Sequence, residues 1–434
     1  MYLFGSQGCG MTCLSTSAFP PPTSDCWNCT VMRREMEAIE MAFRRKTVVT
    51  TTLLRSIEKY SRELREKEGD YVYKIMDFCG THEWTIVHFG LRSLLEKIGA
   101  RNVELIAGPG CPVCVTPSYY IEQSIKLALE GVVVYTYGDV FKVPAIRPVK
   151  GARSLAEAKA LGGDVRIVHS FLHAVIDARR HNKDSLFVGI GFETVAPGYS
   201  EAILKGLVPN NLKLMPLVKL TPPAMFYTLE VVREKPTDYP ISGVIAPGHV
   251  STIVGGKAWR PVTEHFQIPV VVAGFEPNDV LMAIAEILRQ RVRGEYKVVI
   301  EYTRAVTWEG DLKAQSSIRT VFETVDSAWR GIGYIPKSGL ALREEFRKYD
   351  AFDYFGIPDL TPETWRYDLP ANCKCAEVNL GKAKPTDCPL FMKACTPDRP
   401  IGPCMVSVEG TCAIWARFGG GGLAEEIAKA IGVF

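Results

Sequence analysis

The sequence of 434 residues predicts an α/β fold, with two parallel-sheet α/β domains facing each other across a cleft and an irregular cysteine-rich domain after them. Short runs of β-branched residues alternate with amphipathic segments of helical length, which favours parallel sheets covered by helices on both faces. The chain is too long for one ordinary hydrophobic core, so more than one domain is expected. Near the C-terminus, Pro and Gly residues recur often enough to exclude a long helix or a regular strand.

The predicted strands are short apolar runs, at Tyr73–Phe78, Val103–Ala107, Val132–Tyr137, Val165–His169, Leu186–Ile190, Leu214–Val218, Gly243–Ala246, Val270–Ala273 and Val298–Tyr302. Apolar residues at helical spacing predict helices before and between them, at Thr47–Glu68, Thr85–Ile98, Ser118–Leu129, Phe171–His181, Pro222–Arg233 and Asn278–Arg291.

The chain is expected to divide into four parts. Residues 1–44 are rich in Gly, Ser, Thr and Pro in their first thirty positions, which is typical of a loose extension. Residues 45–165 form a first α/β domain and residues 166–335 a second. Residues 336–434 form the cysteine-rich domain.

Composition excludes several classes of function. A formal net charge of +3 is too small to indicate a nucleic-acid partner or an anionic membrane surface. No apolar run is long enough to span a bilayer, and the N-terminus lacks the order of a secretory signal, so we expect a cytoplasmic protein without a membrane partner. The sequence also lacks a dinucleotide-binding glycine motif, a P-loop and a serine nucleophile elbow. In the cytoplasm, clustered thiols favour metal or redox chemistry over static disulfides.

Cys79 begins a predicted strand-to-helix turn, Cys79-Gly80-Thr81-His82. The positive end of the helix dipole favours a thiolate there, which is the form of cysteine that binds metals and attacks disulfides. Thr81 is a candidate helix cap, and His82 is a candidate ligand or hydrogen-bond partner. The alternative is a buried structural cysteine beside a helix cap.

Cys111 and Cys114 form a CxxC motif with an internal proline, directly after the predicted strand Val103–Ala107. This spacing suits thiol–disulfide exchange, and it is also half of many zinc sites. A zinc site that includes Cys79 and His82 is therefore an alternative.

Polar residues follow other predicted strands, where ligands of open parallel sheets collect. They are Asp139, Glu193, Thr194 and His249. If the second domain faces the first across a cleft, Glu193 and His249 lie on the same edge as the thiols. Taken singly, these loops are ordinary strand-to-helix turns in which Thr194 is a candidate cap.

The cysteine-rich tail carries soft ligands at wide spacings, namely Cys373, Cys375, Cys388, Cys395, Cys404 and Cys412. An iron–sulfur cluster, tetrahedral zinc or disulfides can each cross-link such a segment, and the residues alone do not choose between them. The N-terminal extension holds four further cysteines, for which a metal site and an unstructured leader are both open; they are Cys9, Cys13, Cys26 and Cys29.

These motifs together resemble the HypD family of hydrogenase maturation factors, which take part in building the iron centre of nickel–iron hydrogenases. The resemblance runs from about residue 42 to the C-terminus. It rests on Cys79-Gly80-Thr81-His82, residues 108–117, 191–197 and 247–255, and the spaced tail cysteines. Two positions depart from the family pattern: Trp84 stands in place of a second histidine, and Val195 in place of a threonine.

The resemblance implies a [4Fe–4S] cluster on Cys373, Cys388, Cys395 and Cys412. It implies a thiol or disulfide pair of Cys375 and Cys404 beside that cluster, in a relay similar to that of ferredoxin:thioredoxin reductase. The implied cluster makes the tail an iron–sulfur domain.

The same resemblance assigns the forward thiols and the partners. Cys79 would hold the iron of an Fe(CN)₂CO unit jointly with a cysteine of the small chaperone HypC, next to a redox-active pair of Cys111 and Cys114. HypE would deliver cyanide, and the finished unit would pass to the hydrogenase large subunit. Thr81, His82, Thr194 and His249 would be hydrogen-bond donors around the unit.

The expected protein is an assembly scaffold with redox-active thiols rather than an enzyme that turns over alone. Two alternatives remain: a ferredoxin-linked disulfide reductase that uses Cys111 and Cys114, and a zinc-stabilised binding protein.

Overall fold

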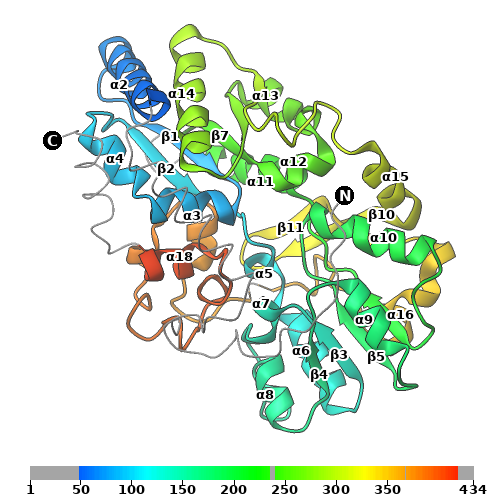
Figure 1. The fold of residues 1–434 in the computed structure, drawn as a ribbon. Coiled ribbons are helices and arrows are strands. Elements are labelled where there is room, and N and C mark those ends of the chain that lie inside the picture. Colours follow the sequence, from blue (N-terminus) through cyan, green and yellow to red (C-terminus); the bar gives the residue numbers. More distant parts are fainter. Residues whose placement is uncertain (1–47, 235–239, 367, 419–434) are drawn as a thin grey trace, which may run out of the picture.

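The computed structural model describes residues 48–234, 240–366 and 368–418 (Figure 1). The predicted loose extension 1–44, with its four cysteines, lies outside these ranges. The fold is α/β, as predicted, and its two larger sheets are entirely parallel. No helix within the described ranges has both the length and the apolar character needed to cross a membrane.

The first sheet has the strand order β2-β1-β7-β8-β9. Its strands are β1 (Tyr73–Asp77), β2 (Val103–Ala107), β7 (Ile241–Pro247), β8 (Val270–Ala273) and β9 (Val298–Ile300). Two amphipathic helices, α2 (Val48–Glu68) and α14 (Pro277–Arg293), pack on each other and on one face of this sheet. The opposite face is covered by α11 (Thr221–Glu234) and by neighbouring helices.

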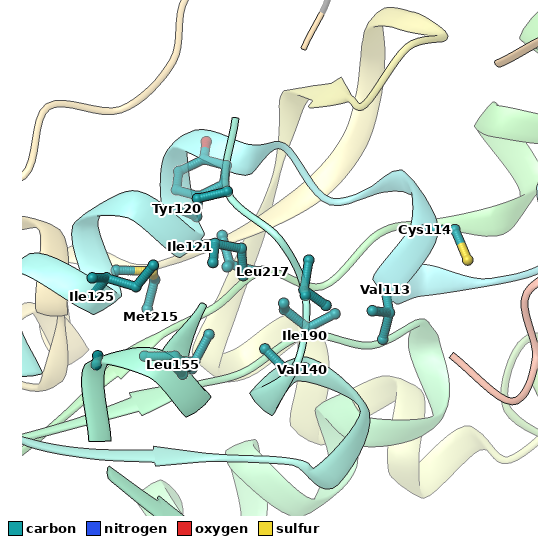
Figure 2. Close-up of a cluster of buried hydrophobic side chains, with 14 of the residues drawn as sticks. Val113, Cys114, Tyr120, Ile121, Ile125, Val140, Leu155, Ile190, Met215 and Leu217 are labelled. Atoms are coloured by element: carbon teal, nitrogen blue, oxygen red, sulfur yellow. The ribbon is translucent and has the colours of Figure 1, made fainter. Parts of the chain in front are cut away.

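The second sheet has the order β4-β3-β5-β6. Its strands are β3 (Val133–Thr136), β4 (Val165–Ile167), β5 (Ser185–Val188) and β6 (Leu212–Met215). Helices α6 (Ser118–Leu129) and α8 (Leu155–Ala160) cover one face, and α9 (Phe171–Ala178) and α10 (Ala196–Leu204) cover the other. Figure 2 shows the core on the α6 side, with Cys114 at its margin.

Short elements connect these layers, and their bounds are α3 (Gly80–His88), α4 (Leu91–Lys97), α5 (Pro112–Val115), α7 (Gly138–Phe141), η1 (Glu193–Val195), α12 (Gly248–Val254), η2 (Gly256–Trp259), α13 (Arg260–Phe266), α15 (Leu312–Val321), η3 (Glu344–Tyr349) and α16 (Ala351–Phe355). The predicted helix Thr85–Ile98 is in fact two helices, α3 and α4. They separate at Gly90, whose φ of 63° is left-handed and ends the first helix.

All the predicted strands are present, but the two sheets do not divide the chain at residue 165. The chain leaves the first sheet after β2, builds the second sheet, and returns along α11 to β7. As a result β1 pairs with β7, with Met76 opposite Val244. The predicted boundary at residue 165 therefore does not separate the two sheets, since each sheet has strands on both sides of it. The order of strands along the chain does not determine which strands become neighbours.

An antiparallel hairpin of β10 (Phe322–Trp329) and β11 (Gly333–Leu342) follows α15. The predicted boundary between residues 335 and 336 cuts through β11 and is therefore incorrect as well. After the hairpin the chain is mostly irregular, with α17 (Cys375–Asn379), η4 (Pro385–Asp387), η5 (Pro403–Met405) and α18 (Thr411–Phe418). In Figure 1 the last of these helices, α18, coloured red, lies against α3.

Candidate functional site

Loops from neighbouring strands meet at the carboxyl edge of the first sheet. The strand order places the loops after β2, β1, β7 and β8 side by side, and these loops carry Cys111, Cys79, His249 and Phe275. Cys79 and His249 were expected to face each other from separate domains. They instead follow paired strands of one sheet, so their proximity does not depend on how two domains are arranged.

The CxxC loop lies directly on the Cys79 loop. The amide of Gly80 donates a hydrogen bond to the carbonyl of Gly110 at 3.1 Å. A Cβ atom on Gly110 would come within 2.7 Å of the backbone of Cys79, so glycine permits this close approach. The two thiol-bearing loops therefore form one unit.

The environment of Cys79 opposes the predicted thiolate. Cys79 itself is the N-cap of α3, so Thr81 lies inside the helix and is not its cap. Burial and then the charge of Glu409 raise the pKa of the Cys79 thiol to about 12, although hydrogen bonds from the amides of His82 and Thr81 lower it. The helix terminus acts in the expected direction, but burial outweighs it. Without a bound cation, Cys79 is a thiol.

A buried acidic group behind Cys79 was not predicted. Burial and the neighbouring Glu83 raise the pKa of Asp77 well above its ordinary value. Glu83 accepts a hydrogen bond from Trp415 at 2.6 Å and pairs with Arg92 at 2.7 Å. These contacts connect α3, α4 and α18. The sequence carried no signal for the contact of Trp415, because this residue lies 332 positions from Glu83 in the chain.

His82 and His249 lie on either side of Phe275. The ring of Phe275 stacks on His82 at 4.9 Å and on His249 at 4.0 Å. His82 is fully buried, and its Nε2 is 3.1 Å and 2.9 Å from the carbonyl oxygens of Ala273 and Gly274. Since carbonyls only accept, Nε2 carries the proton. Burial lowers the pKa of His82 to about 4, so its ring is neutral, whereas His249 is exposed.

Glu193 hydrogen bonds to the first residue of α11. Its carboxylate accepts hydrogen bonds from the amide and the hydroxyl of Thr221, at 2.6 Å and 2.9 Å. Thr194 is exposed inside η1 and does not cap that helix, whose N-cap is Phe192. The predicted capping role is incorrect, yet η1 packs on α12, so Thr194 and His249 belong to elements in contact.

The hydroxyl of Ser407 donates to the carboxylate of Asp139 at 2.8 Å, which joins the end of β3 to the tail. Ser407 and Glu409 were not singled out in the sequence. A Cβ on Gly80 would meet the backbone and Cβ of Glu409, so the tail packs tightly over the Cys79 loop.

Cys111 and Cys114 are joined in a disulfide. The Sγ of Cys114 lies 3.9 Å from the carbonyl oxygen of Pro403, the residue before Cys404. Helix α5, which begins at the CxxC motif, also packs on η5, which contains Cys404. The CxxC disulfide thus lies between the Cys79 loop and the tail.

The tail cysteines are buried together. The Sγ atoms of Cys373 and Cys375 are 3.2 Å apart, and this hydrogen bond holds the pKa of Cys373 below its ordinary value. The Sγ of Cys404 lies 3.7 Å from the side-chain oxygen of Asn379, and the thiols of Cys375, Cys404 and Cys412 lie near enough to influence one another's pKa.

The two remaining tail thiols adjoin Cys373. Cys388 contacts the carbonyl of Asn372 at 3.8 Å, and the charges of Cys373 and Cys388 both act on Cys395. Sequence spacing alone did not specify these neighbours.

The donor set of the tail suits an iron–sulfur cluster. The donors are all thiols, and a cubane cluster takes one thiolate on each iron, so its ligands need not converge on one point. Within the described ranges, no three His, Cys, Asp or Glu side chains are already arranged around a single metal ion. A Cβ on Gly402 would lie 2.7 Å from the sulfurs of both Cys373 and Cys375, so glycine keeps space open beside these thiols.

Fold and site define a parallel α/β protein in which a CxxC disulfide lies between a buried cysteine at a sheet edge and a cysteine-rich tail. The sequence model of the HypD family, described as "Hydrogenase formation hypA family", matches residues 51–419. That match covers most of the chain, including every thiol described above.

Relatives with similar sequences carry consistent names. A hydrogenase expression/formation protein of Methanocaldococcus jannaschii is 42% identical over 348 residues, which are 80% of this chain and 92% of the relative. Hydrogenase maturation factor HypD of Cupriavidus necator is 41% identical over 357 residues, 80% of this chain and 90% of the relative. HypD of Escherichia coli is 37% identical over 367 residues, with 82% and 93% covered. The chain belongs to the HypD family of hydrogenase maturation factors.

Proposed function

We propose that this protein assembles the Fe(CN)₂CO unit of nickel–iron hydrogenases and passes it on. The observation that carries the proposal is the position of the CxxC disulfide, which touches the Cys79 loop through Gly110 and the Cys404 segment through Pro403. Segments that carry thiols far apart in the sequence are thereby in contact, which supports thiol exchange between them. The arrangement supports a redox-assisted scaffold better than a purely structural metal site.

Cys79 is the proposed ligand of the iron under assembly, shared with a cysteine of HypC. Because burial and Glu409 disfavour a free thiolate, iron(II) must displace the thiol proton on binding. The amides of Thr81 and His82 point at the sulfur and stabilise its negative charge. The exposed His249 and Thr194 are proposed hydrogen-bond donors to the cyanide ligands.

Electrons are needed because cyanide comes from a thiocyanate. Release of cyanide from R–S–CN leaves R–SH only if two electrons and protons are supplied. A dithiol of Cys111 and Cys114 supplies both and becomes a disulfide, which is the state in the structure. Restoring the dithiol requires electrons from the tail, where Cys375 and Cys404 are the proposed exchanging pair.

Cys373, Cys388, Cys395 and Cys412 would hold the [4Fe–4S] cluster that supplies single electrons to this pair. Gly402 leaves room next to two of the six thiols, which supports this use of the tail. The proposed partners are HypC, HypE as cyanide donor, and the hydrogenase large subunit. The thiol chemistry requires a reducing compartment, so we place the reaction in the cytoplasm.

The test is the Cys79→Ser variant, purified without oxygen with HypC after iron loading. Loss of the infrared bands of bound cyanide and carbon monoxide, with the visible spectrum and acid-labile sulfide of the tail unchanged, supports the assignment. Ser316→Ala, a matched small substitution on α15, should keep both signals. Infrared bands of normal intensity in Cys79→Ser would show that Cys79 does not hold the iron.

The ferredoxin-linked disulfide reductase makes a different prediction. It requires turnover on a disulfide-bonded protein in the absence of HypC and HypE, abolished by Cys111→Ser. We expect no such turnover from the maturation factor.

A further inference from the structure

A cavity of about 180 Å³ lies between the first sheet and the tail. One wall is formed by β1 and β2, and the opposite wall by residues 378–387, the segment between Cys375 and Cys388. The segment is seated firmly: a Cβ on Gly381 would approach Met76 and Ile106 within 3 Å. The cavity is therefore part of the packed fold.

The charges around this cavity leave an excess of cations. Its carboxylates are already engaged: Glu83 with Arg92 and Trp415, and Glu104 with Lys384 at 3.3 Å.

The third carboxylate, Asp387, accepts a hydrogen bond from the backbone amide of Lys384 at 2.8 Å. By contrast, Lys74 and Lys382 have no hydrogen bond or ion pair from their amines to any described residue. Lys74 is nevertheless only 8% exposed. The amines of Lys74 and Lys382 thus line the cavity as positive charges beyond those paired with its carboxylates, which favours an anion there.

Arg92 supplies a further donor. Its Nε donates to the carbonyl of Leu105 at 3.0 Å and its Nη2 pairs with Glu83, but its Nη1 is buried and has no hydrogen-bond partner among the described residues. An oxygen of a bound anion would satisfy this nitrogen. The guanidinium is held in place by those bonds and by Trp415, whose ring lies 5.3 Å from it.

We propose that this cavity binds a small tetrahedral oxyanion of the phosphate or sulfate class. The three donors come from different elements: Lys74 from β1, Arg92 from α4 and Lys382 from the tail. Together they can bind three oxygens of one anion, which is one more than a carboxylate offers. At about 30 Å³ per water, the cavity has room for about six waters, which suits such an ion and is too small for a nucleotide.

A bound oxyanion would connect the sheet to the tail between two of its cysteines. Occupancy therefore stabilises the tail in its packed position, by mass action. This inference is independent of the proposed function, because none of the groups involved is an assigned ligand or redox thiol.

The test uses the full chain, purified without oxygen and titrated with inorganic phosphate by calorimetry at constant ionic strength. Saturable binding of one phosphate per chain and a rise in Tm with phosphate are expected. Lys382→Met, which removes the charge but keeps an unbranched side chain in a tail loop, should weaken binding about tenfold or more, since charge-assisted hydrogen bonds are strong. Lys74→Met should do the same, and Lys382→Arg should restore binding.

Lys313→Met, an exposed lysine on α15, is the matched control and should bind phosphate as the parent does. Sulfate should compete with phosphate, and acetate should not. The proposal is overturned if no saturable binding occurs, if Lys382→Met binds as tightly as the parent, or if acetate binds and phosphate does not.

Discussion

At the scale of single residues, His82 and His249 both stack on Phe275, but their side chains are expected to contribute different amounts to the stability of the fold. We expect His82→Leu to destabilise the fold by about 1–3 kcal/mol, because the buried carbonyls of Ala273 and Gly274 lose their donor. His249→Leu should cost less than about 1 kcal/mol, since its exposed ring stacks on Phe275 and has no hydrogen bond to a described residue. Urea unfolding of both variants measures the difference. Equal costs would mean that the hydrogen bonds of His82 contribute nothing.

Glu193 gives the protein a pH-dependent stability component. Burial raises its pKa from an ordinary 4.5 to about 7, against hydrogen bonds that favour the carboxylate. The folded carboxyl keeps its proton to higher pH than the unfolded one. Its contribution to stability is therefore fully present below about pH 4.5 and is lost as the pH rises to about 7, with a slope of up to about 1.4 kcal/mol per pH unit.

Glu193→Gln should remove this slope, because an amide does not ionise in this range. The measurement is the free energy of unfolding in urea at several pH values between 4.5 and 7. Glu323→Gln, on the exposed side of β10, controls for the loss of one acidic side chain. An unchanged pH profile in Glu193→Gln would refute the assignment.

At the scale of elements, the contact between the CxxC loop and the Cys79 loop depends on the absence of a side chain. Gly110→Ala should cost about 1–3 kcal/mol, because the new Cβ would lie 2.7 Å from the backbone of Cys79 and the loops would have to separate. Gly198→Ala on α10 is the matched control: a Cβ there meets nothing within 4 Å, so it should stabilise by up to about 1 kcal/mol. Denaturant titration measures whether the free energy of unfolding falls, as expected for Gly110→Ala, or rises, as expected for Gly198→Ala.

At the scale of the whole molecule, α18 connects the tail to the first sheet through Trp415. Trp415→Phe keeps the aromatic bulk but removes the donor to Glu83, which should weaken the attachment of the tail by about 1–3 kcal/mol. Hydrogen exchange should speed up in residues 403–418 and stay slow in β1 and β7. Trp308→Phe, at a side chain that is 43% exposed, should leave exchange in the tail unchanged. Uniform loss of protection in Trp415→Phe would instead indicate one cooperative unit.

Local pattern was enough to find the strands of the two parallel sheets, because most of them are short apolar runs buried on both faces. It failed at Gly90, where one glycine in left-handed conformation splits a continuous helical pattern. It also missed the β10–β11 hairpin, whose outward residues are polar, and the contacts of Asp77, Glu83 and Trp415. Trp415 reaches Glu83 across 332 residues, and the burial of Asp77 is a property of the packed fold, so a single sequence contains no local signal for either.

The sequence by itself determined the α/β class, the thiol-bearing turns at strand ends and the membership of a family, since each is written in residue type and spacing. Only the tertiary structure decided which strands share a sheet, that the CxxC disulfide lies between Cys79 and the tail, and that Cys79 is a thiol rather than a thiolate. Pairing across more than a hundred residues and burial of a sulfur atom are properties of the packed chain. Neither follows from local preference, because both are set by which surfaces meet when the whole molecule folds.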